Sequence, residues 1–374
     1  MKNIITLRHH LHQHPELSNQ EKETAATISS FMQNLTPDEI FDTGKTGKIF
    51  LFKGTEPGPT VLFRAELDAL PIQENNKLPY LSKKAGVAHL CGHDGHMAIL
   101  AGLAQNIAHQ RPVKGKVGLL FQPAEEVEQG AYDVVQSKSF KQLNPDYLFA
   151  LHNIPGNPLH QVIIKEGSFS AASKGMTVKL TGQTSHAAEP ENGLNPDTAI
   201  ARIIDSLHQV CKQHERFTSL VLLTIIHLRL GEKSFGTSPG EAEICITLRA
   251  YENRDMEILT QDATERIEKI ARDEKLQCKI SFSEVFPATI NDPDCVAMIR
   301  KSAEMNDLPV FQRQEPFKWS EDFSYYTKQY KGGFFGLGSG INQPALHNPD
   351  FDFPDELLNT GINLFTSIYK NLNF

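Results

Sequence analysis

The sequence predicts a two-domain α/β protein, in which an α/β domain with a mixed sheet is interrupted by a smaller ferredoxin-like domain. The chain has 374 residues, about twice the length of an ordinary domain. Its first half alternates short, continuous apolar runs with helical stretches, as expected when a sheet is covered on both faces. Its middle part follows the order β-α-β-β-α-β, which is the ferredoxin-like pattern.

In the first half, four apolar runs predict buried strands. They span residues 49–52, 61–65, 117–121 and 147–151. A helix is predicted over residues 97–109, and another follows Ser18-Asn19-Gln20-Glu21, which fits a capping box. In α/β sheets ligands bind at the carboxyl ends of strands, and the polar clusters of this half are predicted to lie at such ends.

The middle of the chain predicts the inserted domain. Strands are expected over residues 176–180, 220–228, 242–248 and 279–285, and helices over residues 196–213 and 254–275. The predicted boundaries are therefore residues 1–167 for the first part of the α/β domain, 168–285 for the insertion and 286–374 for the second part. A glycine-rich strand end is expected at residues 334–340.

Composition and charge exclude several classes of protein. The net charge is −8, whereas a nucleic acid or an anionic membrane surface would require a clustered basic face. The apolar stretches are too short to span a bilayer, and the N-terminus has no apolar signal region. Five widely spaced cysteines fit reduced thiols. We therefore expect a cytoplasmic protein without nucleic-acid or membrane partners.

The densest polar cluster predicts a metal site. It runs His89-Leu90-Cys91-Gly92-His93-Asp94-Gly95-His96. Thiolate and imidazole bind zinc and neighbouring metals well, and glycine lets the backbone turn tightly around an ion. A turn with a buried thiol is the structural alternative, which would suffice for a lone Cys or His. His96 is expected in the first turn of the following helix, away from the metal.

Three further sites follow apolar runs. Glu125 and Glu126 are adjacent carboxylates, so one can hold a metal while the other transfers a proton. His152 ends another run, and His347 follows the glycine-rich segment. Each alone would be explained by a solvated loop or a structural histidine, but together they predict one centre. The histidines at positions 9, 10, 12 and 14 are expected on or beside the first helix, in surface or packing roles.

Along nearly its whole length the chain resembles the metallopeptidase-like amidohydrolases, which include auxin-conjugate hydrolases, hippurate hydrolases, N-acetyl-diaminopimelate deacetylases and bacterial aminoacylases. The resemblance rests on seven motifs. They are Leu11-His12-Gln13-His14-Pro15-Glu16, Arg64-Ala65-Glu66-Leu67-Asp68-Ala69-Leu70-Pro71, Cys91-Gly92-His93-Asp94-Gly95-His96, Gln122-Pro123-Ala124-Glu125-Glu126, Ser185-His186-Ala187-Ala188, Glu321-Asp322-Phe323 and Leu346-His347.

The resemblance implies two divalent metal ions per chain, with manganese or zinc favoured and cobalt or nickel also suitable. The metal ligands implied are Cys91, His93, Glu126, His152 and His347. Cys91 would bridge the two ions, His93 and His152 would complete one, and Glu126 and His347 the other. Glu125 falls at the catalytic carboxylate. Asp68 would orient a ligand, and His186 of the lid domain would stabilise the oxyanion.

The function implied is hydrolysis of an amide bond in a small N-acyl amino acid or related conjugate, by attack of metal-bound hydroxide with Glu125 as general base and acid. A dipeptidase or carboxypeptidase on the same fold is the nearer alternative. A non-catalytic metal-stabilised binding protein is the other, supported only by Glu66, where the family usually has Asp, and by the lid loop 235–241. The sequence leaves open the native metal, the acyl group, the amino acid, and whether the chain is a monomer or a homodimer.

Overall fold

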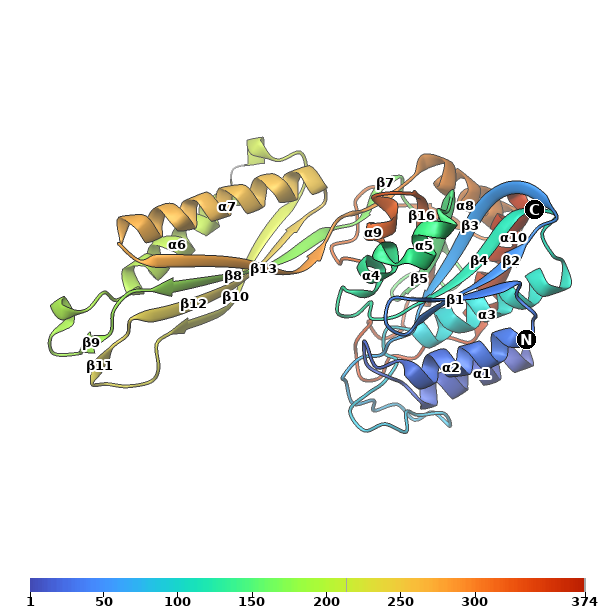
Figure 1. Cartoon of the computed structure of the whole chain (residues 1–374), viewed down its shortest axis with the longest axis horizontal. Coiled ribbons are helices and arrows are strands. Elements are labelled where there is room, and N and C mark those ends of the chain that lie inside the picture. The colour runs from blue at the N-terminus through green and yellow to red at the C-terminus, as the bar shows by residue number, and fades with distance from the viewer. Residues whose placement is uncertain (213, 373–374) are drawn as a thin grey trace. The chain divides into compact units, whose positions relative to one another are not determined.

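The computed structural model describes residues 1–212 and 214–372. The last residue of the predicted helix 196–213 and the last two residues of the chain lie outside this part. The chain forms two compact units (Figure 1). The first unit comprises residues 1–169, 289–316 and 321 onward, and the second comprises residues 170–288 and 317–320. The domain boundaries predicted at 167/168 and 285/286 stay predictions.

The first unit is built on a mixed eight-stranded sheet with the order β1-β2-β4-β3-β5-β16-β6-β15. Its strands are β1 (Glu39–Thr43), β2 (Gly47–Lys53), β3 (Glu56–Glu66), β4 (Lys114–Gln122), β5 (Tyr147–Ile154), β6 (Val162–Ile164), β15 (Val310–Gln312) and β16 (Lys331–Gly338). β4, β3, β5 and β16 run parallel to one another, whereas β1/β2, β2/β4 and β16/β6 are antiparallel pairs. The α/β fold with a mixed sheet is thereby confirmed.

Helices cover this sheet. They are α1 (Lys2–Gln13), α2 (Lys22–Gln33), α3 (His93–His109), α4 (Gly130–Gln136), α5 (Lys138–Leu143), α8 (Pro293–Met305), α9 (Ser324–Thr327) and α10 (Glu356–Asn371). The central helix α3 packs against β3 and is itself covered by α1, α2 and α10. Its residues 93–104 are all buried, as are residues 60–66 of β3 and 117–122 of β4. This burial explains why the strands appear in the sequence as continuous apolar runs.

The second unit has the predicted order β-α-β-β-α-β. Its elements are β8 (Ala172–Thr181), α6 (Asp197–Val210), β10 (Val221–Leu230), β12 (Glu241–Ala250), α7 (Asn253–Asp273) and β13 (Gln277–Phe286). The antiparallel sheet has the order β10-β12-β8-β13, and α6 and α7 pack against each other beside it (Figure 1). The remaining elements are β7 (Gly167–Ser170), β9 (Ser185–His186), β11 (Thr237–Ser238), β14 (Thr289–Asn291) and the 3-10 turns Pro190–Asn192 and His214–Arg216.

The capping box predicted at residues 18–21 is wrong. Helix α2 does follow it, but the residue before the helix, Glu21, forms no side-chain cap. The Ser18 hydroxyl donates to Asp68 Oδ2 at 2.7 Å, and the Glu21 carboxylate accepts from the backbone N–H of Ala124 at 2.8 Å. Both side chains therefore bind partners far away in sequence, which a local motif does not show.

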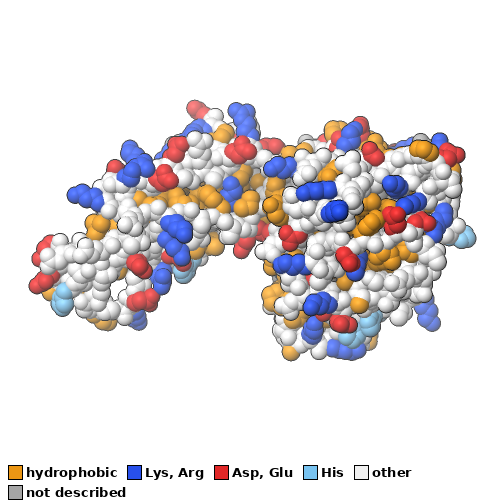
Figure 2. All heavy atoms as spheres, viewed as in Figure 1, with side chains coloured by type: hydrophobic (Ala, Val, Ile, Leu, Met, Phe, Trp, Pro, Cys, Tyr) orange, Lys and Arg blue, Asp and Glu red, His pale blue; other side chains and the backbone are white. Residues whose placement is uncertain are grey.

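The surface carries charges of both signs. On the face shown in Figure 2, Lys and Arg side chains lie interspersed with Asp and Glu side chains on both units. Among the residues described, no helix combines the length and the apolar character needed to cross a bilayer.

Candidate metal centre

Acidic and imidazole side chains lie at the carboxyl ends of three neighbouring strands, at one edge of the sheet. β3, β4 and β5 are parallel, so their carboxyl ends meet at the same edge. Asp68 follows β3, Glu125 and Glu126 follow β4, and His152 lies near the end of β5. After β4 the chain turns sharply at Ala124, whose φ is +51°. These four side chains are thereby held at one edge by the sheet.

Cys91 and His93 lie at the same edge of the sheet, but the start of a helix positions them there instead of a strand end. The sequence placed this cluster at a strand end, but that placement is wrong, because the loop 67–92 separates it from β3 and it opens helix α3. Gly92 at the start of the helix has a φ of +98°, and a Cβ atom there would lie 2.2 Å from Asn153 Oδ1. Only glycine allows this close approach of the helix start to the end of β5.

His347 comes from the loop between β16 and α10. Its φ is +66°, and its backbone N–H donates to the carbonyl of Leu90 at 2.9 Å, which fixes the loop beside the Cys91 segment. Its Nε2 lies 3.7 Å from Glu126 Oε2, and half of its side chain is exposed. His347 therefore lies on the solvent-exposed side of the candidate ligands.

The candidate ligand atoms form two groups that share one residue. One group is Cys91, His93 and His152, and the other is Cys91, Glu126 and His347; within each group the atoms lie within 4.8 Å of one another. Cys91 Sγ is 3.4 Å from His152 Nε2, and His93 Nε2 is 3.8 Å from Glu126 Oε1. These are the two sets that the resemblance implied, and the ligand roles themselves stay predictions.

The hydrogen bonding of the site fits a cation. His93 Nδ1 lies 2.9 Å from the backbone oxygen of Asp68, so Nδ1 carries a hydrogen and Nε2 is the ring nitrogen left to face a metal. That buried Nε2 has no hydrogen-bond partner among the described residues, nor has Glu126 Oε1. Buried polar atoms without partners are costly, and a metal ion placed between these two would bind both.

Asp68 holds two of the candidate ligands in place. Besides its backbone contact with His93, its Oδ2 accepts from the backbone N–H of Glu126 at 2.9 Å and from Ser18. A rigid carboxylate behind metal ligands is the arrangement that orients them. The resemblance implied this role for Asp68, and the role stays a prediction.

Acidic groups crowd this cluster and shift the pKa values of its members. Burial raises the pKa of the Cys91 thiol, and Glu126 and Glu125 raise it further. Burial also raises the pKa of Glu126 to about 7, although His93 opposes it. Burial and then the charge of Glu321 raise the pKa of Glu125. Divalent cations would relieve this repulsion and favour the deprotonated ligands.

Sequence reasoning missed a buried arginine network behind Glu125. Arg64 is fully buried on β3, where Nε donates to Gln122 at 2.9 Å and Nη2 donates to Glu321 and Asp322 at 2.9 and 2.6 Å. It also binds Glu66. The signal was the alternation of Arg64 and Glu66 along the strand, which places both side chains on one face. Local pattern alone did not identify their partners.

His96 is nearby but its ring is already bound. It lies in the first turn of α3, as predicted, and within 4.8 Å of ligand atoms of His93 and Glu66. Its Nδ1 contacts Glu66 Oε2 and its Nε2 contacts Asn153 Oδ1, both at 2.7 Å. Both nitrogens of the His96 ring are therefore engaged by other residues.

His186 lies in the second unit. It belongs to β9, which pairs with β11. Its side chain is exposed, and its Nδ1 accepts a hydrogen bond from the backbone N–H of Ala188 at 3.0 Å. The other ring nitrogen is therefore the one that can donate. Its catalytic role stays a prediction.

Comparison with known proteins gives consistent matches over the chain. Residues 62–371 match the model of peptidase family M20/M25/M40. The N-acetylcysteine deacetylase of Bacillus subtilis is 31% identical, with 98% of this chain and 95% of the relative covered. The B. subtilis YXEP protein, a dinuclear metal binding peptidase from the M20 family, has a TM-score of 0.84 at 29% identity, over 98% and 96% of the two chains. A structure from methicillin-resistant Staphylococcus aureus has a TM-score of 0.92 at 26% identity, over 99% and 96%.

Proposed function

Because the chain belongs to peptidase family M20/M25/M40 and is thus a metal-dependent hydrolase, we propose that it hydrolyses the amide bond of a small N-acyl amino acid or a related conjugate. The observation that carries the proposal is the position of Glu125. Its Oε2 lies 3.9 Å from His93 Nε2, beside two groups of candidate ligands that share Cys91. A carboxylate next to such a centre is placed to move a proton.

We assign the metal ligands as Cys91, His93, Glu126, His152 and His347. Thiolate, imidazole and carboxylate together suit manganese, zinc, cobalt and nickel, with the first two favoured. When bound, two divalent ions supply a water of lowered pKa and polarise the substrate carbonyl.

The residues of the chain perform the remaining steps. Glu125 takes the proton from the attacking water and delivers it to the leaving amine, which requires one group to act first as base and then as acid. Burial and the neighbouring carboxylate of Glu321 raise the pKa of Glu125, which is the direction that helps a carboxyl to donate its proton in the second step. Asp68 keeps His93 and Glu126 in place, and His186 donates to the developing oxyanion.

The expected substrate class follows from the relatives. The deacetylase of B. subtilis bears the name of an N-acyl amino acid as its substrate, and it matches this chain over nearly its whole length. The Cys91-Gly92-His93 motif also favours the N-acyl branch of the family over its peptidases. We therefore place N-acyl amino acids before dipeptides.

The test is amine release from matched substrates. The protein is loaded with Mn, Zn, Co or Ni in turn and assayed with N-acetyl amino acids, N-benzoyl amino acids and dipeptides of the same amino acids. We expect N-acyl substrates to give the higher kcat/KM with at least one metal. Faster hydrolysis of the dipeptides would assign the chain to peptide substrates instead, and no hydrolysis with any metal would contradict the proposal.

A further inference from the structure

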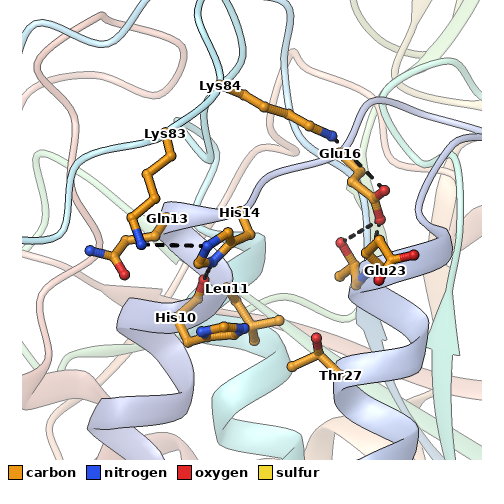
Figure 3. A pocket seen from close by; sticks show the side chains of 10 residues that line it. His10, Leu11, Gln13, His14, Glu16, Glu23, Thr27, Lys83 and Lys84 are labelled. Carbon is orange, nitrogen blue, oxygen red and sulfur yellow. Dashed lines mark hydrogen bonds and ion pairs between the residues drawn. The ribbon is translucent and has the colours of Figure 1, made fainter.

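A cavity on the first unit is lined by none of the candidate metal ligands. It has a volume of about 350 Å³ and lies between α1, α2 and the loop that carries Lys83 and Lys84 (Figure 3). The backbone N–H of Lys83 donates to the carbonyl of Gln13 at 2.9 Å, which fixes this loop to the end of α1. The cavity is thus preformed and large enough for a small metabolite.

One side of this cavity carries an unbalanced positive charge. His10, His14 and Lys83 lie together there, and the two imidazole rings are 4.4 Å apart (Figure 3). His14 Nδ1 donates to the backbone oxygen of His10 at 2.8 Å, so its Nε2 is the acceptor for Lys83 Nζ at 3.5 Å. Burial, followed by the charges of His14 and Lys83, lowers the pKa of His10. Across the described residues, no carboxylate pairs with Lys83.

The other side carries an unbalanced negative charge. Glu16 is occupied, because its Oε2 accepts from the Thr24 backbone and hydroxyl at 2.8 and 3.0 Å, while its Oε1 faces Lys84 at 3.9 Å. Glu23 is exposed and has no hydrogen bond or ion pair within the part of the chain that the structure describes. Figure 3 shows Glu16 and Glu23 across the cavity from Lys83, with Leu11 between the two sides.

We propose that this cavity binds a free amino acid, whose carboxylate contacts Lys83 and whose ammonium contacts Glu23. Glu16 and Lys84 lie within ion-pair distance of each other, whereas the Lys83 ammonium and the Glu23 carboxylate have no ion-pair partner in the described part of the chain and lie on opposite sides of the cavity. A simple anion would satisfy only the first and a simple cation only the second, whereas a zwitterion satisfies both. Because the charged groups are exposed, each contributes little, and the binding is expected to be weak.

The cavity is linked to the candidate metal centre through Glu16. The backbone oxygen of Glu16 accepts from the N–H of Ala69 at 2.8 Å, and Ala69 follows Asp68, which orients His93 and Glu126. This side of the cavity is therefore connected by a backbone hydrogen bond to the residue next to Asp68. We expect an amino acid bound here to change kcat, and this consequence alone rests on the proposed function.

The test measures binding directly, by calorimetric titration of L-leucine into the metal-loaded protein. Leucine is titrated into the wild type, Lys83→Ala, Glu23→Gln, the double variant and the matched control Lys138→Ala, which changes an exposed lysine on α5. All five proteins retain the metal centre, so any binding of leucine there contributes equally to every titration. A difference in leucine binding between the proteins therefore reports on the cavity. Melting temperatures confirm that each variant is folded.

We expect each single variant to weaken this component roughly two- to fivefold and the double variant to weaken it about tenfold, with the control unchanged. In the wild type, 4-methylpentanoate and 3-methylbutylamine each carry one of the two charges and should bind less tightly than leucine. Equal leucine binding by the double variant and the control would overturn the proposal, as would analogues that bind as tightly as leucine. Since these measurements do not depend on turnover, their failure is distinguishable from failure of the proposed hydrolase function.

Discussion

Replacing Glu125 with Gln tests the proton-transfer step most directly. The substitution keeps the shape of a side chain that is 10% exposed, and it removes the ability to accept a proton. It also removes one negative charge from a cluster that includes Glu321 and Asp322, whose ligand atoms lie within 4.8 Å of those of Glu125. We therefore expect the folded state to be as stable as the wild type or more stable, since buried like charges repel each other.

The expected loss is confined to turnover. General acid and base catalysis contributes about 10²- to 10⁴-fold, and here one carboxylate serves both steps, so kcat should fall by about that factor. Such a loss corresponds to roughly 3–5 kcal/mol of transition-state stabilisation. The metal content should remain unchanged, because the candidate ligands are other residues.

The assay compares wild type, Glu125→Gln and the matched control Glu304→Gln, an exposed residue of α8. Steady-state amine release, metal content after dialysis and melting temperature are measured on the same preparation of each protein. Near wild-type kcat in a fully metal-loaded Glu125→Gln protein would refute the assignment. A loss of kcat that follows a loss of metal would instead make Glu125 a ligand, which also contradicts the reasoning.

Three further predictions concern other parts of the molecule. Cys91→Ser should lose bound metal on dialysis while Cys245→Ser retains it, because a neutral hydroxyl replaces a thiolate shared by both ligand groups; retention of two equivalents by Cys91→Ser would be inconsistent with this. His186→Ala should lower kcat with unchanged metal content and melting temperature, whereas loss of stability alone would indicate a packing role. Burial would lower the pKa of His12, but Asp94 and other partners raise it from 6.5 to about 9, so the charged ring stabilises the fold by about 3 kcal/mol below pH 6.5. In urea unfolding, the difference between wild type and His12→Asn should therefore shrink as the pH rises through 9, and a difference independent of pH would contradict this origin.

Much of the fold followed from local pattern. The apolar run at residues 117–121 became the buried core of β4, and the alternating pattern from residue 176 became part of β8, because burial on two faces or one imposes different periods. Local pattern failed at Ser18, where a sequence typical of a helix cap was used instead to bind Asp68. A local motif shows which hydrogen bonds a side chain can form nearby. Residues distant in sequence can form a hydrogen bond with the same side chain instead.

The order of elements, the family resemblance and the chemically competent residues around Cys91 and Glu125 can all be recognised in the sequence. Which of these residues meet depends on how the chain folds. Arg64 binds Asp322, 258 positions away, and the cavity between Lys83 and Glu23 is formed by segments that no sequence period connects. The physical reason is that periodicity records whether a side chain is buried, whereas its partner is chosen by the packing of whole strands and helices, which brings together residues distant along the chain.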